Sequence, residues 1–297
     1  MSRLPADHSM RMERVRLSIE GLSVGDALGQ QFFPPSRRLL ISYRQIPEGT
    51  WHYTDDTEMA LAIAETLDRH GFIDQDFLAS RFADRYVARP SRGYGGGAMD
   101  LLAAISSGEP WAKASRELFD GEGSMGNGGA MRAAPVGAYF ADEPTRIVDE
   151  ARRSAEVTHA HPEGIAGAIA IAVAAGWAWR RRHKNERQDL LELVLDCLTP
   201  GDLRVGVERA QTLRGESSFE RVVGILGNGS RVIARDTVPL CLWCIDRHPD
   251  DFAEALWTAY SALGDIDTNG AIVGGVVSLA SDPKQITTKW RDCREPL

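Results

Sequence analysis

Apolar residues recur at intervals of three to four positions in one segment after another, and this spacing constrains the fold more than any other feature of the chain. It is the period of an amphipathic helix, whereas no convincing run shows the alternation of a half-buried strand. Helix-start signals agree, because Pro144 and Pro162 suit first-turn positions and Asp74, Asp250 and Asp251 suit caps. The segments with helical spacing are 13–31, 56–70, 76–88, 98–106, 145–156, 162–182, 187–198, 219–226, 238–246, 251–262 and 271–281.

We therefore predict an all-α protein. No repeat and no linker rich in proline or serine divides the chain, so we expect one domain over residues 1–297, with a flexible N-terminus at residues 1–12. The hydrophobic share of 43% is enough for a substantial core. The apolar segment 165–179 is shorter than the roughly 20 residues of a membrane span, so we expect it to be a central core helix.

The charge and the cysteines exclude several classes of function. A formal net charge of -8 argues against a nucleic acid or an anionic membrane surface as the main partner. The four cysteines are scattered, which does not resemble a disulfide framework and suggests a reducing compartment. Cys241 and Cys244 lack a second ligand pair at zinc spacing, so we expect them to pack inside a buried helix. No secretory leader is recognisable, and a cytoplasmic location is the expectation.

An unusual density of oxygen-bearing side chains precedes one apolar helix, in the stretch "YTDDTEMALAIAETL" at residues 53–67. One helix start needs one capping residue, but here Thr54, Asp55, Asp56 and Thr57 stand together. Two carboxylates and two hydroxyls exceed the requirement of a cap. Their oxygens can converge on a hard cation at the positive end of the helix dipole.

A second acidic cluster, formed by Asp265, Asp267 and Thr268, precedes the apolar segment 271–281. Taken alone it reads as a turn and a cap, with Thr268 opening the helix. If both clusters meet, four carboxylates share a small volume and repel one another unless protons or a cation neutralise them. The oxygen-only ligand set favours Mg²⁺ or Mn²⁺ over zinc and has enough ligands for two ions.

Five motifs in order resemble the ADP-ribosylglycohydrolases, the family of dinitrogenase reductase-activating glycohydrolase. The resemblance runs from about residue 20 to residue 290 and implies an orthogonal all-α fold, a binuclear Mg²⁺ or Mn²⁺ centre and release of ADP-ribose from a modified acceptor. The motifs are "SVGDALGQ" at 23–30, "TDDTEMALAIAETL" at 54–67, "GSMGNGGAMRAAPVG" at 123–137, "THAHPEGIAGA" at 158–168 and "GDIDTNGAIVGG" at 264–275. By the same resemblance, the metal ligands are Thr54, Asp55, Asp56, Asp265, Asp267 and Thr268.

A glycine-rich loop follows the helix-like stretch "WAKASRELF". Its G-x-G-x-x-G spacing is not preceded by a strand, so it is not a dinucleotide fingerprint, and no Walker lysine follows. Glycines there let backbone N–H groups approach anionic oxygens, while a flexible loop is the alternative. The resemblance makes this loop a cradle for the diphosphate and ribose, formed by Ser124, Met125, Gly126, Asn127, Gly128 and Gly129.

Four further residues are singled out with less specific roles. The resemblance makes His159 a substrate contact, whereas a structural role is the usual one for a lone histidine. Tyr94 is expected either to stack on an adenine or ribose face or to pack as a partly exposed tyrosine. Asp26 either supports a metal ligand or caps and packs. Glu48 is a positional candidate for the flap glutamate of some relatives.

The leading hypothesis is hydrolysis at the anomeric carbon of a ribose that is attached to a protein side chain, with an arginine linkage favoured. Asp55, Asp56 and Asp267 are the expected catalytic residues, and Asp55 or Asp56 accepts a proton from the attacking water. The partner is then an ADP-ribosylated protein. The alternatives are a hydrolase of a free ADP-ribosyl metabolite such as O-acetyl-ADP-ribose, and a binding protein without turnover.

Overall fold

The computed structural model describes residues 4–297, which form seventeen α-helices and two short 3₁₀ helices. β-Structure in this range is limited to two isolated bridges, so the prediction of an all-α protein is confirmed. The first half of the chain contains α1 (His8–Gln30), η1 (Pro35–Arg37), α2 (Arg38–Ser42), α3 (Asp55–His70), α4 (Gln75–Ala88), α5 (Gly96–Ser106), α6 (Trp111–Glu117), α7 (Gly128–Met131), α8 (Ala134–Tyr139) and α9 (Pro144–Glu156). The second half contains α10 (Pro162–His183), α11 (Leu190–Cys197), α12 (Asp202–Thr212), α13 (Phe219–Leu226), α14 (Ala234–Arg247), α15 (Phe252–Ser261), α16 (Ile266–Ala280), η2 (Pro283–Gln285) and α17 (Thr288–Cys293).

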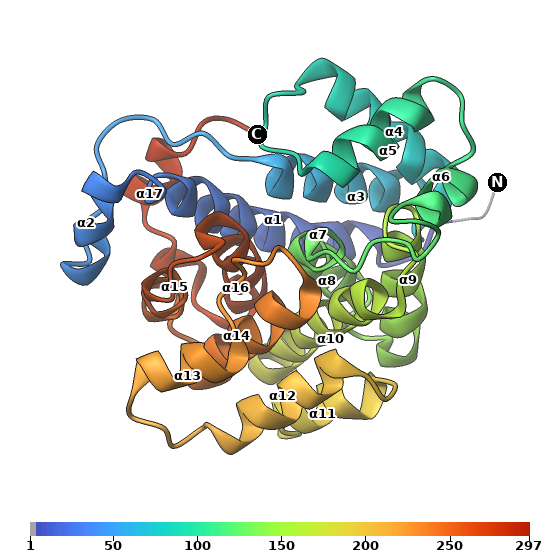
Figure 1. The fold of residues 1–297 in the computed structure, drawn as a ribbon. Coiled ribbons are helices and arrows are strands. Elements are labelled where there is room, and N and C mark those ends of the chain that lie inside the picture. Colours follow the sequence, from blue (N-terminus) through green and yellow to red (C-terminus); the bar gives the residue numbers. More distant parts are fainter. Residues whose placement is uncertain (1–3) are drawn as a thin grey trace.

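Two long helices form the centre of the molecule. In Figure 1, α1 runs through the middle, with α4, α5 and α6 on one side of it and α11, α12 and α13 on the opposite side. α10 packs against α8, α9 and α16 and is buried along most of its length. By length and composition α10 has the character of a membrane span, but its apolar window is mostly covered by other helices. The expectation of a core helix at residues 165–179 is confirmed.

Helices α1 and α16 pack against each other through glycines spaced four residues apart. A Cβ atom on Gly25 would lie 2.0 Å from the carbonyl oxygen of Gly270, and one on Gly270 would lie 2.3 Å from that of Gly25. Gly21 and Gly274 repeat this mutual contact one turn away, also with 2.3 Å in both directions. The two backbones therefore touch directly. The helices are antiparallel, because the contact moves backward along α16 as it moves forward along α1. We call these four residues the glycine seam.

The glycine seam determines where α16 begins relative to α1. A Cβ atom on Gly29 would lie 2.7 Å from the Cα atom of Asp267, so the first turn of α16 lies against the last turns of α1. Tyr260 supports the contact by donating its hydroxyl hydrogen to the carbonyl oxygen of Gly25 over 2.8 Å. Polar residues in this turn of α16 are thereby brought beside the buried face of α1.

Most local signals are confirmed. Each of the predicted segments overlaps a helix, Pro144 and Pro162 occupy first-turn positions, and Asp74 and Asp251 cap α4 and α15. Asp250 is not the cap of α15, because the side chain of the next residue accepts the bond from the N–H of Glu254. All four cysteines are free, and the pair on α14 is buried as expected.

Several boundaries differ from the prediction. α1 begins at His8, so residues 8–12 of the expected flexible terminus are helical, and residues 1–3 of it lie outside the described residues. Helix α16 begins at Ile266 with Asp265 at the N-cap position, so Thr268 lies inside the first turn and does not open the helix. The apolar period does not extend into this turn because Asp267, Thr268 and Asn269 are polar. The helices α2, α7, α8, α12 and α17 were not predicted.

The glycine seam predicts a large asymmetry between two glycine substitutions. Gly25→Ala places a methyl group against backbone atoms that have no space to move, so we expect a loss of about 1–3 kcal/mol in the free energy of unfolding. The control is Gly224→Ala, an exposed helical position with open space around it, where the better helix propensity of alanine should stabilise by about 0.5–1 kcal/mol. Urea denaturation measures both, and equal stability of Gly25→Ala and the wild type would contradict the close contact.

Candidate functional site

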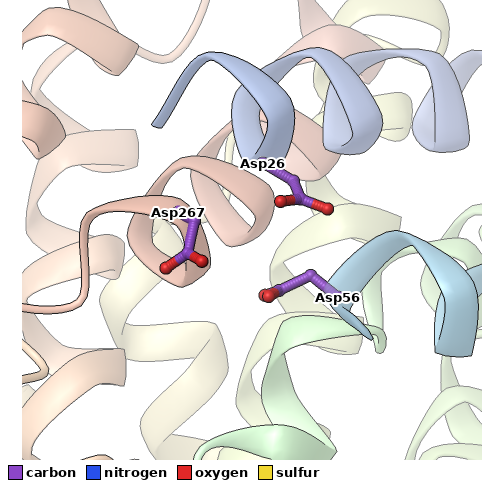
Figure 2. A group of neighbouring side chains, drawn as sticks. All are labelled: Asp26, Asp56 and Asp267. Carbon is purple, nitrogen blue, oxygen red and sulfur yellow. The ribbon is translucent and has the colours of Figure 1, made fainter. Parts of the chain in front are cut away.

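Three helices bring carboxylates to one point. Asp26 comes from the last two turns of α1, Asp56 from the first turn of α3 and Asp267 from the first turn of α16, and Figure 2 shows the three side chains turned toward one another. One carboxylate oxygen from each lies within 4.8 Å of the others. The two acidic clusters that are far apart in the sequence do meet, as the sequence analysis required.

Asp26 organises the start of α3. Its carboxylate accepts bonds from the backbone N–H groups of Thr54 and Thr57 at 2.9 and 3.2 Å, and from their hydroxyls at 2.9 and 2.6 Å. Three donors serve this fully buried carboxylate alone and the Thr54 hydroxyl is shared with Asp56, which leaves Asp26 little capacity for a cation. This geometry favours the first of the two expectations for Asp26, a supporting role. Asp26 lies on α1 and holds the start of α3, which carries Asp56, by hydrogen bonds between the two helices.

Asp56 is buried, and only one of its two carboxylate oxygens is hydrogen-bonded. Its Oδ2 atom lies 2.9 Å from the hydroxyl of Thr54 and 3.5 Å from that of Thr268, while its Oδ1 atom is enclosed without a hydrogen-bond partner in residues 4–297. The single hydroxyl hydrogen of Thr54 serves either Asp56 or Asp26 at any moment, because both accept at the same distance. The buried Oδ1 atom therefore still needs a proton or a cation.

Burial and mutual repulsion oppose ionisation of the cluster. Burial and then the neighbouring carboxylates raise the pKa of Asp56 and of Asp267 well above the usual range. The same causes raise the pKa of Asp55 to about 7, although the Arg132 guanidinium partly offsets the shift. Burial raises the pKa of Asp26 to about 6 against the effect of its hydrogen-bond donors. Such a cluster is stabilised by a divalent cation.

The donor chemistry suits a hard cation. Carboxylates and threonine hydroxyls are the only side-chain groups of the predicted ligand set, and one buried carboxylate oxygen has no hydrogen-bond partner within residues 4–297. Oxygen ligands of this kind are preferred by Mg²⁺ and Mn²⁺. Glu58 does not belong to the set, because its buried carboxylate pairs with Arg85 at 2.6 Å and with Arg89 at 2.9 Å.

The remaining members of the two clusters lie at the margin of this group. Asp55 is only partly exposed, and its Oδ1 atom is 3.6 Å from the position of a Cβ atom on Gly93. Asp265 accepts a bond of 2.7 Å from the side-chain amide of Asn127. Burial raises the pKa of Asp265, and the bond from Asn127 opposes that shift.

The glycine-rich loop is attached to the acidic cluster by Asn127. This buried amide also donates to the hydroxyl of Thr237 over 3.0 Å, so its nitrogen is fully engaged within the protein. The backbone of the loop pairs with the segment before α14, where Met125 accepts from Ala234 at 3.0 Å. Ser124 is also engaged, because its hydroxyl accepts from the N–H of Gly126 at 3.1 Å. The loop is an ordered connection with internal bonds.

Open backbone donors occur where this loop enters α7. The N–H groups of Gly128 and Gly129 belong to the first turn of that helix, and neither bonds to another part of residues 4–297. A Cβ atom on Gly128 would lie 3.0 Å from the His159 ring, so the loop and the histidine are in direct contact. These groups together can receive an anionic or hydroxyl-bearing ligand.

The two histidines after α9 have different roles. His159 is buried, and burial together with the positive charge of Arg132 lowers its pKa to about 3, so the ring is neutral. Its Nδ1 atom lies 2.7 Å from the hydroxyl of Thr158. His161 is the N-cap of α10 and accepts from the N–H of Glu163 at 3.1 Å, which is a structural role.

Tyr94 corrects one expectation. Its ring packs edge-on against Tyr86 with 5.2 Å between ring centres and is only 6% exposed, so the face is not free to stack on an adenine or ribose. The packing alternative is the one that this geometry supports. Glu48 is exposed on the loop between α2 and α3, and no contact with the acidic cluster is found for it in the described range.

Sequence reasoning missed Arg132 and Thr158, which lie under the glycine-rich loop. Both lie inside recognised motifs: Arg132 ends "GNGGAMR" and Thr158 begins "THAHP". The residues assigned a role were the glycines before Arg132 and the histidine after Thr158. Arg132 is fully buried, which is rare for an arginine and is not visible from composition. A charged residue inside a small-residue run was the available signal.

Comparison with known proteins agrees with this geometry. Residues 7–296 match the ADP-ribosylglycohydrolase family. The chain is 31% identical to ADP-ribosylhydrolase ARH3 of Mus musculus, over 83% of this chain and 74% of that protein, and 30% identical to ADP-ribosylhydrolase ARH3 of Homo sapiens, over 82% and 75%. It is also 25% identical to the uncharacterized protein YegU of Escherichia coli, over 90% and 87%.

A solved structure has the same fold. It is described as an ADP-ribosylglycohydrolase-related protein complex, is 27% identical and superposes with a TM-score of 0.69, over 97% of this chain and 94% of that chain. The resemblance inferred from five motifs is therefore confirmed over nearly the full length. The chain belongs to the ADP-ribosylglycohydrolase family of glycosyl hydrolases.

Proposed function

We propose that this ADP-ribosylglycohydrolase is a divalent-cation-dependent enzyme that hydrolyses the bond between the anomeric carbon of ADP-ribose and a protein side chain. One observation carries the proposal. The carboxylate of Asp56 is buried among other carboxylates, and its Oδ1 atom has no hydrogen-bond partner in the part of the chain that the structure describes. A cation is the simplest way to satisfy that atom and to neutralise the cluster at neutral pH.

The residues present fit Mg²⁺ or Mn²⁺. Asp26 already accepts from three protein donors of its own and shares the Thr54 hydroxyl with Asp56, so we assign it a supporting role. When bound, the metal would supply charge neutralisation and polarisation of ribose and water oxygens. The ligands we assign are Thr54, Asp55, Asp56, Asp265, Asp267 and Thr268. Two ions remain our proposal, since this number of hard ligands is sufficient for them.

Asp55 is the better candidate for the proton acceptor. Asp56 is 2% exposed and engages the hydroxyl of Thr54, whereas Asp55 is more exposed and lies beside the loop at Gly93. A carboxylate that faces the ligand can take a proton from water as that water attacks the anomeric carbon. Asp56 and Asp267 are then assigned to metal binding and not to proton transfer. Asp265 is positioned by Asn127.

The glycine-rich loop is the proposed binding region for the diphosphate and the ribose. The N–H groups of Gly128 and Gly129, which bond to nothing among the described residues, offer donors to anionic oxygens, and His159 borders them. Asn127 acts through Asp265 rather than through its own amide nitrogen, because that nitrogen is engaged. The loop backbone is thus the proposed binding group for the ligand, and the carboxylates are the proposed binding groups for the metal.

A substrate panel tests the function. The purified protein is incubated with ADP-ribosylated arginine, ADP-ribosylated serine and O-acetyl-ADP-ribose, each with Mg²⁺ and with a chelator, and released ADP-ribose is measured. Release from a side chain only with Mg²⁺ is the expected result, and the arginine linkage stays our prediction. Release from O-acetyl-ADP-ribose alone would favour a metabolite hydrolase, and absence of release would favour a binding protein.

Asp267→Asn should remove most of the activity. The substitution takes one negative charge from the cluster at the start of α16, so we expect kcat to fall on the order of 100-fold or more. Asp149→Asn, at an exposed position of α9, is the matched control and should behave as the wild type. Steady-state kinetics and far-ultraviolet circular dichroism check both variants. Full activity in Asp267→Asn would remove Asp267 from the mechanism.

The raised carboxyl pKa values predict how stability depends on pH without metal. Asp26 and Asp55 bind protons more tightly in the folded state, with pKa values of about 6 and about 7 against a usual value of 3.8. Their stabilising contribution is therefore complete below pH 4 and is lost as the pH rises through 6 and 7. The melting temperature of chelated protein should fall between pH 5.5 and pH 8.

Added Mg²⁺ should raise the melting temperature more at pH 8 than at pH 5.5, because protons no longer compete for the carboxylates. Asp55→Asn removes one titrating group and should flatten the profile of the chelated protein. Differential scanning fluorimetry measures each case. A melting temperature that rises with pH in the chelated protein, or that ignores Mg²⁺ at pH 8, would contradict the proposed centre.

A further inference from the structure

A fully buried arginine joins the glycine-rich loop to the segment that carries His159. Arg132 follows α7, and its Nη1 atom donates to the carbonyl oxygen of Gly128 over 2.9 Å. Its Nη2 atom donates to the hydroxyl of Thr158 over 2.6 Å and to the carbonyl oxygen of Ser154 over 3.3 Å. The guanidinium also lies 4.5 Å from the ring centre of Phe82. This side chain is therefore held in one place and presents a donor to Thr158.

The hydroxyl of Thr158 lies between a group that only donates and a ring nitrogen that either donates or accepts. Arginine has no acceptor, so the hydroxyl oxygen must accept from Arg132. The hydroxyl hydrogen then has one acceptor in the described part of the chain, the Nδ1 atom of His159 at 2.7 Å. If Nδ1 carried the hydrogen instead, the buried Thr158 hydroxyl would have no acceptor, which is costly.

The opposite ring nitrogen of His159 faces the glycine-rich loop. A Cβ atom on Gly126 would lie 3.2 Å from Nε2, and one on Gly128 would lie at the same distance. Nε2 has no hydrogen-bond partner in residues 4–297 and is not fully enclosed. Side chains larger than hydrogen at these two positions would cover this nitrogen, so the glycines keep it accessible.

We propose that Arg132 and Thr158 are positioning residues that lock the His159 imidazole in the tautomer with its hydrogen on Nε2, so that the ring donates to an oxygen of the ADP-ribosyl group held in the loop. The nature of that ligand rests on the proposed function. The tautomer itself rests only on the three side chains and their two short contacts. Arg132 also anchors the carbonyl of Gly128, so one buried cation sets both the loop and the ring that faces it.

The neutral state of the ring supports this arrangement. Burial and the charge of Arg132 lower the pKa of His159, so the imidazolium form is not populated at neutral pH. A neutral imidazole has one donor and one acceptor, and the choice between them decides whether the ligand meets an N–H or a lone pair. A lone pair on Nε2 would repel phosphate and hydroxyl oxygens, whereas an N–H attracts them.

The experiment compares Thr158→Val with Thr158→Ser, since truncation of the fully buried Arg132 side chain leaves a cavity that destabilises the fold. Valine keeps the shape of threonine and removes the hydroxyl, while serine keeps the hydroxyl. Nitrogen-15 NMR of the histidine side chains reports which ring nitrogen carries the hydrogen, with His159 assigned by His159→Gln. Calorimetry with ADP-ribose reports affinity.

The wild type and Thr158→Ser should show a protonated Nε2 and a hydrogen-bonded, unprotonated Nδ1 at His159. In Thr158→Val the Nδ1 resonance should lose its hydrogen-bonded position, and ADP-ribose should bind about three- to tenfold more weakly. A hydrogen on Nδ1 in the wild type, or equal affinity of Thr158→Val and the wild type, would overturn the proposal. Failure of the wild type to bind ADP-ribose would instead refute the proposed function, because the NMR result in the free protein does not depend on the ligand.

Discussion

The direct backbone contact between α1 and α16 is the constraint on which the rest of the site depends. Glycines at both helices allow the carbonyl oxygens of Gly25 and Gly270 to approach the opposite backbone, at distances that no other residue tolerates. Asp26 and Asp267 are each one to three residues from such a glycine, so the separation of the two helices sets the separation of their carboxylates. A wider helix pair would place the same acidic residues too far apart to share a cation.

The acidic cluster also depends on how α3 begins. A first turn with free N–H groups is normally capped by its own side chains, and here Thr54 does so only weakly, accepting from Asp56 at 3.4 Å. The main acceptor for this turn is Asp26, which belongs to another helix. One buried carboxylate thereby satisfies the backbone and hydroxyls of α3 and leaves Asp56 free to face Asp267. The stability of the fold and the geometry of the cluster are produced by the same hydrogen bonds.

Local patterns were sufficient to predict the class of fold, most helices and the two acidic clusters, because helical period and capping chemistry are properties of neighbouring residues. The role of Asp26 and the burial of Arg132 and Tyr94 were not predictable in this way, since each depends on contacts between helices that are far apart in the sequence. The glycine seam had a visible signal, glycines four residues apart in both helices, but the pairing of those helices required the structure. Helices α7 and α8 are short and rich in glycine and proline, so their period was too brief to detect.

The bond between Asn127 and Asp265 links two regions that the proposed reaction uses for different ligands. A cation that orients Asp265 would change the position of the carboxylate to which Asn127 donates. A ligand that orders the loop would in turn change how firmly Asn127 holds Asp265. Thermodynamic linkage makes such an effect equal in both directions, so any strengthening of ADP-ribose binding by the cation has a matching strengthening of cation binding by ADP-ribose. A short amide–carboxylate contact of 2.7 Å is thus a structural route to cooperativity between the proposed cation and the proposed ADP-ribosyl ligand.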